Sequence, residues 1–293
     1  MSKRIWALLA ATVVSLIYGL SFTIAKDVMP KYVMPFGFIV LRVSGATVLF
    51  WLISCFGPKE KIRSADIPRI IAAAFFGVAL NMLTFFKGLS YTSPILGAVI
   101  MVTTPMIVLI LSAFIMKERM KSRKIIGILL GLVGTGFLIL YGKPLGNASH
   151  ATLGNLLVFI NAVSYGFYLI LVKKLMDHYH AFTFVKWIYT IALIMVLPFG
   201  WNECAAIQWA HLPTAILWEI GFVVVFTTFF TYLFNLVSMR ELKPTTVAVF
   251  IYLQPLFATL FAIGLGKDSL TGVKIISAGL IFGGVFLVTH KKS

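Results

Sequence analysis

Long apolar segments alternate with short polar ones along the whole chain of 293 residues. A transmembrane helix needs about 20 predominantly apolar residues to cross a hydrocarbon core roughly 30 Å thick. Segments of this length recur, and the connections between them are too short to hold a soluble domain. The pattern therefore predicts ten transmembrane helices, at residues 5–25, 36–56, 68–88, 92–114, 123–141, 152–172, 182–200, 214–238, 244–265 and 270–289.

The composition agrees with this pattern and excludes other classes of protein. Hydrophobic residues make up 60% of the chain and charged residues 12%, and the mean hydropathy is +0.99. Soluble domains have about 45–50% apolar and 25% charged residues, so a soluble, disordered or disulfide-scaffold protein is excluded. We expect an all-α integral membrane protein surrounded by the lipid bilayer.

The net charge of +16 matters through its distribution. Of the 25 Lys and Arg residues, 18 lie at one set of span ends, six lie at the other, and Arg42 lies inside the second span. Positive residues are retained on the cytoplasmic side of a membrane. This distribution predicts that both termini are cytoplasmic in a multi-pass protein of the inner (plasma) membrane. We expect no nucleic-acid partner, because the basic residues are scattered over short loops.

The two halves of the sequence resemble each other, which indicates an internal repeat. Matching positions separated by 150 residues are Pro94 and Pro244, Pro105 and Pro255, Lys117-Glu118 and Lys267-Asp268, Lys124 and Lys274, and Gly134 and Gly284. Tyr18-Gly19 and Tyr165-Gly166 match at a separation of 147 residues. We place the two five-helix repeats at residues 1–146 and 147–293. Because five is odd, the second repeat enters the membrane inverted, which is the plan of many alternating-access transporters.

The ends of the fourth and ninth spans carry a resemblance to a known family. The segment YTSPILGAVIMVTTPMIVLILSAFIMKERMKSRKIIGILLGLVGTGFLI and its second copy, LKPTTVAVFIYLQPLFATLFAIGLGKDSLTGVKIISAGLIFGGVFLV, resemble the repeat of EamA-type members of the drug/metabolite transporter superfamily. The second copy departs at Asp268-Ser269, where Glu-Arg is usual. The resemblance implies that spans 1, 3, 4, 6, 8 and 9 line a central cavity and that spans 5 and 10 are peripheral. It also implies export of a small metabolite.

Polar residues near the middle of the six implied helices are the candidates for a substrate site. They are Ser15, Tyr18, Asn81, Thr103, Thr104, Asn161, Ser164, Tyr165, Thr227, Thr231, Tyr252 and Gln254. Pro105 and Pro255 each free a backbone carbonyl that can bind a zwitterion or a hydroxyl. Ser and Thr hydroxyls also bond to their own helix, so the three amides are the stronger candidates. The repeat-related Tyr18 and Tyr165 suit an aromatic or amphipathic substrate.

Two charged residues inside the predicted spans have competing interpretations. Arg42 and Glu219 each lie about a turn and a half below the outer edge. Arg42 either receives a substrate carboxylate, pairs with Glu219, or extends to the outer headgroups, and the last is the simplest interpretation. Glu219 either extends in the same way or carries a coupling proton, and it is the foremost acid for that role.

Other motifs predict packing. Gly127-x-x-x-Gly131 and Gly279-x-x-x-Gly283 allow close helix contact, and we expect this contact within each half, in a monomer or weak homodimer. We expect Glu118 and Asp268, which lie at turns, to cap the next helix or pair locally.

Other functional classes are less well supported by the sequence. The histidines lie in loops or at span ends, and the His178 and His180 pair lacks a convincing third metal ligand, so we expect no metal, cofactor or enzyme activity. A channel would show a filter motif or charged ring. We therefore expect an exporter of small metabolites such as amino acids. A multidrug or nucleotide-sugar carrier of the same fold is the alternative.

Overall fold

The structure of the chain, a computed structural model, describes residues 2–91, 94–141, 151–264 and 271–290. Its helices are α1 (Lys3–Val28), α2 (Pro35–Ser54), α3 (Ile67–Ala74), α4 (Leu80–Tyr91), α5 (Pro94–Met101), α6 (Thr104–Ile115), α7 (Ser122–Leu140), α8 (Ala151–Met176), α9 (Ala181–Ala205), α10 (Thr214–Phe222), α11 (Thr231–Glu241), α12 (Pro244–Val249), α13 (Leu253–Gly264) and α14 (Gly272–Thr289). These residues contain no β-strand.

Ten helical segments in the described part of the chain are long and apolar enough to cross a membrane, which confirms the predicted all-α membrane fold. Several of these spans are composite. The third consists of α3, the π-helical turn Phe75–Ala79 and α4, and the eighth consists of α10, the π-helical turn Val223–Phe230 and α11. The fourth consists of α5 and α6, and the ninth of α12, the 3₁₀ turn Phe250–Tyr252 and α13. The predicted repeat boundary between residues 146 and 147 and the predicted turn at Asp268 lie outside the described residues.

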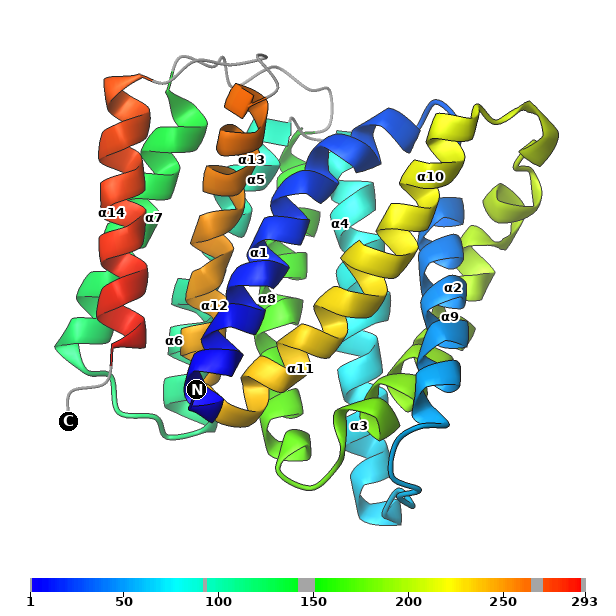
Figure 1. The fold of residues 1–293 in the computed structure, drawn as a ribbon, viewed down its shortest axis with the longest axis horizontal. Coiled ribbons are helices and arrows are strands. Elements are labelled where there is room, and N and C mark those ends of the chain that lie inside the picture. The colour runs from blue at the N-terminus through cyan, green and yellow to red at the C-terminus, as the bar shows by residue number, and fades with distance from the viewer. Residues whose placement is uncertain (1, 92–93, 142–150, 265–270, 291–293) are drawn as a thin grey trace.

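Figure 1 shows how the spans are arranged. Helices α7 and α14 pack side by side at one edge, and α2 and α9 pack together at the opposite edge. Between the edges, α1 runs obliquely beside the eighth span and contacts α13 as well. The N- and C-terminal ends of the chain lie at the same face of the bundle. Spans 5 and 10 therefore occupy one edge, as the family resemblance implied.

The glycine motif of the fifth span mediates contact between the halves, so the expectation of contact within each half is wrong. A Cβ atom at Gly284 would lie 2.5 Å from the carbonyl oxygen of Gly127 and 2.8 Å from the backbone nitrogen of Gly131. These glycines bring the backbones of α7 and α14 together, as small residues do between membrane helices. Gly279 and Gly283 have no atom within 4 Å of an added Cβ, so their motif does not mediate this contact.

Small residues also bring α2 against α9, and a carboxylate closes the end of this contact. A Cβ atom at Gly200 would lie 2.3 Å from the carbonyl oxygen of Phe36. Glu203 Oε2 accepts hydrogen bonds from the backbone nitrogens of Phe36 (2.7 Å) and Gly37 (2.9 Å). Helix α2 has no capping side chain of its own. Glu203 from the second half therefore neutralises the positive N-terminal end of a helix in the first half.

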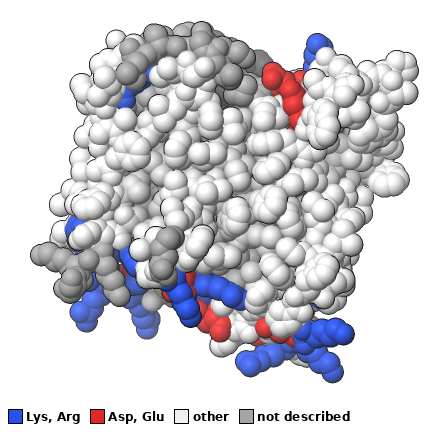
Figure 2. All heavy atoms as spheres, viewed as in Figure 1, with Lys and Arg blue, Asp and Glu red and all other residues white. Residues whose placement is uncertain are grey.

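Lys and Arg residues gather on the face that holds both termini, which we call the basic face (Figure 2). Here Lys117, with φ of 52°, turns the chain after α6, and the following Glu118 is nearly buried. The Glu118 carboxylate pairs with Lys124 of its own half and lies 3.5 Å from Lys243 Nζ of the other half. Lys124 Nζ also donates to Thr245 Oγ1 at 2.9 Å. Glu118 thus pairs locally, as predicted, but also across the two halves.

Candidate functional site

The fourth and ninth spans are interrupted at matching places because of their prolines. The break between α5 and α6 immediately precedes Pro105, and the 3₁₀ turn between α12 and α13 precedes Pro255. A proline lacks the backbone N–H and its ring crowds the carbonyl one turn earlier, so an α-helix cannot continue unchanged. Both halves thereby place irregular backbone inside the bundle.

Side-chain hydroxyl groups donate hydrogen bonds to backbone carbonyls at these breaks. Thr103 Oγ1 donates to the carbonyl of Ile100 (2.7 Å) and Thr104 Oγ1 to that of Met101 (2.6 Å). Ser15 Oγ, on α1, donates to the carbonyl of Phe250 at 2.8 Å. Backbone polar groups in a membrane interior must find such partners. The three hydroxyls therefore satisfy backbone carbonyls at the interrupted helices in this conformation, and the carbonyl that Pro105 frees, that of Met101, is already engaged.

The third and eighth spans carry π-helical turns, also at matching places, and π turns are frequent at functional sites. Ser164 Oγ, on α8, donates to the carbonyl of Phe76 at 2.6 Å, and Tyr232 Oη, on α11, donates to that of Gly77 at 2.8 Å. The ring of Tyr168 packs directly on Gly77, where an added Cβ would lie 2.1 Å from a ring carbon. Side chains of the second half therefore both pack on the π turn of the first half and donate hydrogen bonds to it.

Three tyrosines that the sequence analysis did not single out form a layer beside this π turn. The ring centroid of Tyr232 lies 5.0 Å from that of Tyr189 and 6.2 Å from that of Tyr168. Tyr165 lies 6.0 Å from Tyr168 on the same helix. The hydroxyl of Tyr168 is buried and has no hydrogen-bond partner among the described residues. The signal was the spacing of Tyr165 and Tyr168, which puts both on one face of a helix.

Asn81 of α4 and Asn161 of α8 contact each other, and each side-chain amide donates to the backbone carbonyl of the other residue, so one polar pair joins the two halves. Asn161 Nδ2 donates to the carbonyl of Asn81 at 2.7 Å, and Asn81 Nδ2 donates to the carbonyl of Asn161 at 3.4 Å. The Asn161 side chain is buried, and its Oδ1 atom has no partner among the described residues. A buried acceptor without a partner is costly. Asn161 Oδ1 is therefore an acceptor left without a donor inside the described part of the bundle.

The predicted Tyr18, Thr227 and Thr231 lie at the contact of α1 with the eighth span, together with Ser21, which was not predicted. Ser21 Oγ and Thr227 Oγ1 are 2.6 Å apart, and Thr231 Oγ1 lies 3.3 Å from Tyr18 Oη. Thr231 also donates to the carbonyl of Thr227 at 2.6 Å. The contact of α1 with the eighth span therefore has a continuous polar strip on its buried side.

Arg42 is buried, so the interpretation that it extends to the outer headgroups is wrong. Its side chain is enclosed by the protein, with the whole residue 8% exposed. Arg42 Nε donates to Thr228 Oγ1 at 3.1 Å, and the guanidinium carbon lies 5.6 Å from the ring centroid of Phe86. No ion pair between Arg42 and Glu219 forms among the described residues, which overturns the second interpretation as well. Receipt of a substrate carboxylate by Arg42 stays a prediction.

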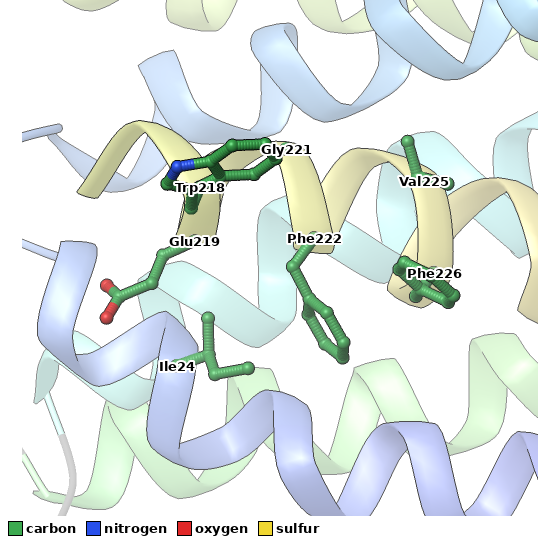
Figure 3. Close-up of a pocket in the computed structure, with 7 residues that line it drawn as sticks. All are labelled: Ile24, Trp218, Glu219, Gly221, Phe222, Val225 and Phe226. Carbon is green, nitrogen blue, oxygen red and sulfur yellow. The ribbon is translucent and has the colours of Figure 1, made fainter. Parts of the chain in front are cut away.

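Glu219 lies at a separate cavity of about 460 Å³ between α1 and α10, shown in Figure 3. The other lining residues are apolar or aromatic: Ile24, Trp218, Gly221, Phe222, Val225 and Phe226. The carboxylate lies at one end of the cavity, away from the rings of Phe222 and Phe226. Glu219 Oε2 is buried without a partner among the described residues. Glu219 is therefore partly enclosed rather than fully extended to solvent.

Two predicted site residues lie apart from this assembly. The buried ring of Tyr252 packs on Gly131 of α7, where an added Cβ would lie 2.2 Å from the ring. Gln254 is half-buried at the start of α13, and its carbonyl oxygen packs against Gly19 of α1. Tyr252 thus belongs to the packing of the α7 and α14 edge, whereas Gln254 lies at the contact of α1 and α13.

Two halves of five spans, each interrupted inside the membrane and joined there by polar pairs, define a membrane transport protein. Residues 5–140 and 152–290 each match the EamA-like transporter family. The chain therefore belongs to the EamA-like transporter family.

Known proteins similar to this chain agree with that assignment. An uncharacterized transporter of Archaeoglobus fulgidus is 27% identical over 288 residues, which cover 98% of this chain and 99% of the relative. The uncharacterized transporter YetK of Bacillus subtilis is 22% identical over 99% of this chain and 88% of its own length. One solved crystal structure superposes with a TM-score of 0.77 at 17% identity, covering 97% of this chain and 96% of the other. That likeness shows a shared fold.

Proposed function

We propose that the protein is a secondary transporter that exports small metabolites, amino acids first among them, by alternating access. The observation that carries the proposal is the polar contact between Asn81 and Asn161 across the two halves, beside the π turn of the third span. Inverted halves can exchange roles, so a state open to one side has a counterpart of similar energy open to the other. A substrate bound between the halves is then carried across by their rocking.

The orientation follows from the charge distribution. We assign the basic face to the cytoplasm, because positive residues concentrate on the cytoplasmic side of membrane proteins. In this state Glu118 ties the halves together at the basic face. The tyrosine layer of Tyr168, Tyr189 and Tyr232 lies between that face and Arg42 along the spans. We take this layer as the barrier that must open for a cytoplasmic substrate to enter.

The substrate site combines residues of both halves. Its proposed members are Ser15, Tyr18, Arg42, Asn81, Thr103, Thr104, Asn161, Ser164, Tyr165, Thr227, Thr231 and, at the contact of α1 with α13, Gln254. Tyr252 is no longer a member, because its ring is buried against Gly131 of α7. Within this set the amides make the most specific contacts, because each offers a donor and an acceptor. Asn161 Oδ1 suits an ammonium or hydroxyl donor of the substrate.

The experiment that tests export uses cells that overproduce the protein and are loaded with amino acids by dipeptide feeding. Excretion into the medium should rise with the wild type, and Asn81→Ala, Asn161→Ala and Gln254→Ala should reduce it at equal membrane levels. Asn202→Ala, at an exposed position near the end of α9, is the matched control and should behave as the wild type. If cells with the wild-type protein excrete no amino acid faster than cells without it, the proposal is contradicted.

Glu219 is the proposed carrier of a coupling proton. Its Oε2 atom is enclosed without a partner among the described residues, at the edge of an apolar cavity, and intramembrane acids commonly serve as proton relays. Glu219→Gln should abolish the dependence of transport on a pH gradient, whereas Glu241→Gln, at the exposed far end of the same span, should retain it. Unchanged dependence in Glu219→Gln would remove this role.

A further inference from the structure

Arg42 is a buried cation without a carboxylate partner among the described residues. Asp66, the other buried charged residue among those that the structure describes, does have partners. Asp66 accepts a hydrogen bond from Tyr179 Oη at 2.7 Å and pairs with Arg69 at 3.6 Å. A buried charge is unfavourable unless it is paired. An ionisable residue inside a membrane span is therefore first considered as part of a functional site. Arg42 lies roughly 10 Å below the start of α2, so it is well inside the membrane.

The hydrogen bond to Thr228 fixes which part of the guanidinium is available. Thr228 Oγ1 donates its single proton to the carbonyl of Val223 at 2.8 Å, a contact that the π turn of the eighth span creates. The same oxygen must then accept the hydrogen bond from Arg42 Nε. The two terminal nitrogens of Arg42 make no hydrogen bond to another described residue. These nitrogens form the fork that binds a carboxylate through two parallel hydrogen bonds.

The groups that contact the Arg42 guanidinium carry no negative charge. Phe86 lies on one side of it, and Thr228 accepts the hydrogen bond from its Nε atom. Neither side chain is an anion, so the positive charge stays uncompensated in a residue that is 8% exposed. An incoming anion is therefore favoured and an incoming cation is repelled at short range in a weakly screened environment.

We propose that Arg42 receives the carboxylate of the substrate, so that the transporter accepts zwitterionic amino acids and organic monocarboxylates and rejects organic cations. This inference rests on the proposed transport function, because it assigns the substrate class of the same site. It also assigns Thr228 as a positioning residue that aims the guanidinium. The π turn of the eighth span then has a function: it brings the Thr228 hydroxyl into line with both Val223 and Arg42.

Binding to the purified full-length protein tests the inference without requiring transport. The probes are phenylalanine, leucine and phenylpropionate, which carry a carboxylate, and phenylalaninamide and tetraphenylphosphonium, which are cations without one. Thermal stabilisation by the three carboxylates is expected in the wild type, with none by the two cations. Arg42→Gln should weaken carboxylate binding by about tenfold or more, as loss of a charge-assisted hydrogen-bond pair does. Arg119→Gln, which removes an exposed arginine, should bind like the wild type.

A second variant keeps the inference testable if Arg42→Gln does not fold. Thr228→Val keeps the shape of the side chain and removes the hydroxyl that holds Arg42. It should raise the half-saturation concentration for phenylalanine counterflow while leaving the maximal rate unchanged. A merely structural role of Thr228 would lower the amount of folded protein and leave the half-saturation concentration unaltered.

The outcomes separate this inference from the proposed function. Wild-type counterflow of phenylalaninamide or tetraphenylphosphonium as fast as phenylalanine would overturn the role of Arg42 while leaving a transporter. Carboxylate binding that depends on Arg42, without any counterflow, would support the inference and contradict the transport proposal. Absence of stabilisation by all three carboxylates, or equal binding by the wild type and Arg42→Gln, would overturn the inference.

Discussion

The Glu118 carboxylate lies 3.5 Å from the ammonium group of Lys243 and joins the first half of the protein to the second. Glu118 follows the left-handed turn at Lys117, which directs it towards the start of α12. Its side chain is 6% exposed, whereas that of Lys243 is 63% exposed and that of Lys124 is 15% exposed. The buried carboxylate therefore depends mainly on Lys124, and the link to the other half is an exposed and weaker contact.

These exposures predict unequal effects of two matched substitutions. Lys124→Met removes the enclosed partner of Glu118 and should lower the free energy of unfolding by about 1–3 kcal/mol. Lys243→Met removes the exposed partner and should change it by less than about 1 kcal/mol. Denaturation of the two variants in the same detergent measures the difference. Equal losses would mean that the pairing of Glu118 differs from that described.

Two adjacent glycines of α14 should respond oppositely to alanine. In Gly284→Ala the new Cβ would lie 2.5 Å from the carbonyl oxygen of Gly127, so α7 and α14 must separate and the thermal midpoint should fall. In Gly283→Ala the new Cβ meets no atom within 4 Å, and the midpoint should stay the same or rise, since alanine favours a helix over glycine by about 0.5–1 kcal/mol. Thermal unfolding of both variants decides this; a stable Gly284→Ala protein would refute the contact.

Glu203 should stabilise the contact of α2 with α9. Glu203→Ala leaves the backbone N–H groups of Phe36 and Gly37 without their acceptor, and the loss of a helix cap costs about 0.5–2 kcal/mol. Glu203→Gln keeps an acceptor oxygen but loses the charge, so it should lie between the wild type and Glu203→Ala. The free energies of unfolding in detergent rank the stability of the three proteins. A Glu203→Ala protein as stable as the wild type would exclude the cap.

We expect His180, a histidine at the basic face, to make the stability of the fold depend on pH. His180 Nδ1 accepts a hydrogen bond from the backbone nitrogen of Phe182 at 3.3 Å and so caps α9. Burial, and secondly the charge of Arg240, lower the pKa of His180 below its usual value, although Glu60 opposes this. The folded state therefore takes up the proton less readily than the unfolded state. The stability that neutral His180 contributes is fully present above pH about 6.5 and is lost as pH falls through the lower folded pKa.

The measurement is the thermal midpoint between pH about 7.5 and about 5. His180→Asn supplies a cap that does not titrate in this range, so its midpoint should fall less steeply than that of the wild type. His178→Asn alters an exposed neighbouring histidine and should follow the wild-type curve. Parallel curves for the wild type and His180→Asn would show that another group titrates.

The ten spans could be predicted because lipid imposes one strong requirement, about 20 apolar residues per helix. The proline breaks in spans four and nine followed equally directly from the missing N–H of Pro105 and Pro255. The pairing of Gly127 with Gly284 could not be predicted, because small residues show that a helix has a close neighbour but not which one.

The site was only partly predictable for a related reason. Hydropathy gives the depth of a residue along a helix, so it selected Asn81 and Asn161 as two separate polar residues near the middle of their spans; that they contact each other is seen only in the structure. It does not give the direction in which a side chain points. Tyr252 therefore proved to face α7, and Arg42 proved to be enclosed rather than exposed. The π turns, which place Thr228 against Arg42, have no simple signature in residue type.

Counterflow of labelled phenylalanine in proteoliposomes preloaded with unlabelled phenylalanine tests directly whether the protein carries amino acids. A carrier that alternates between two faces should show saturable, transient accumulation of label, and Asn161→Ala should slow it at equal protein content. We expect the label to overshoot its equilibrium level and then decline, across a panel that includes leucine. Flux that does not saturate, or no exchange of any amino acid, would contradict an amino acid carrier with its site between the two halves.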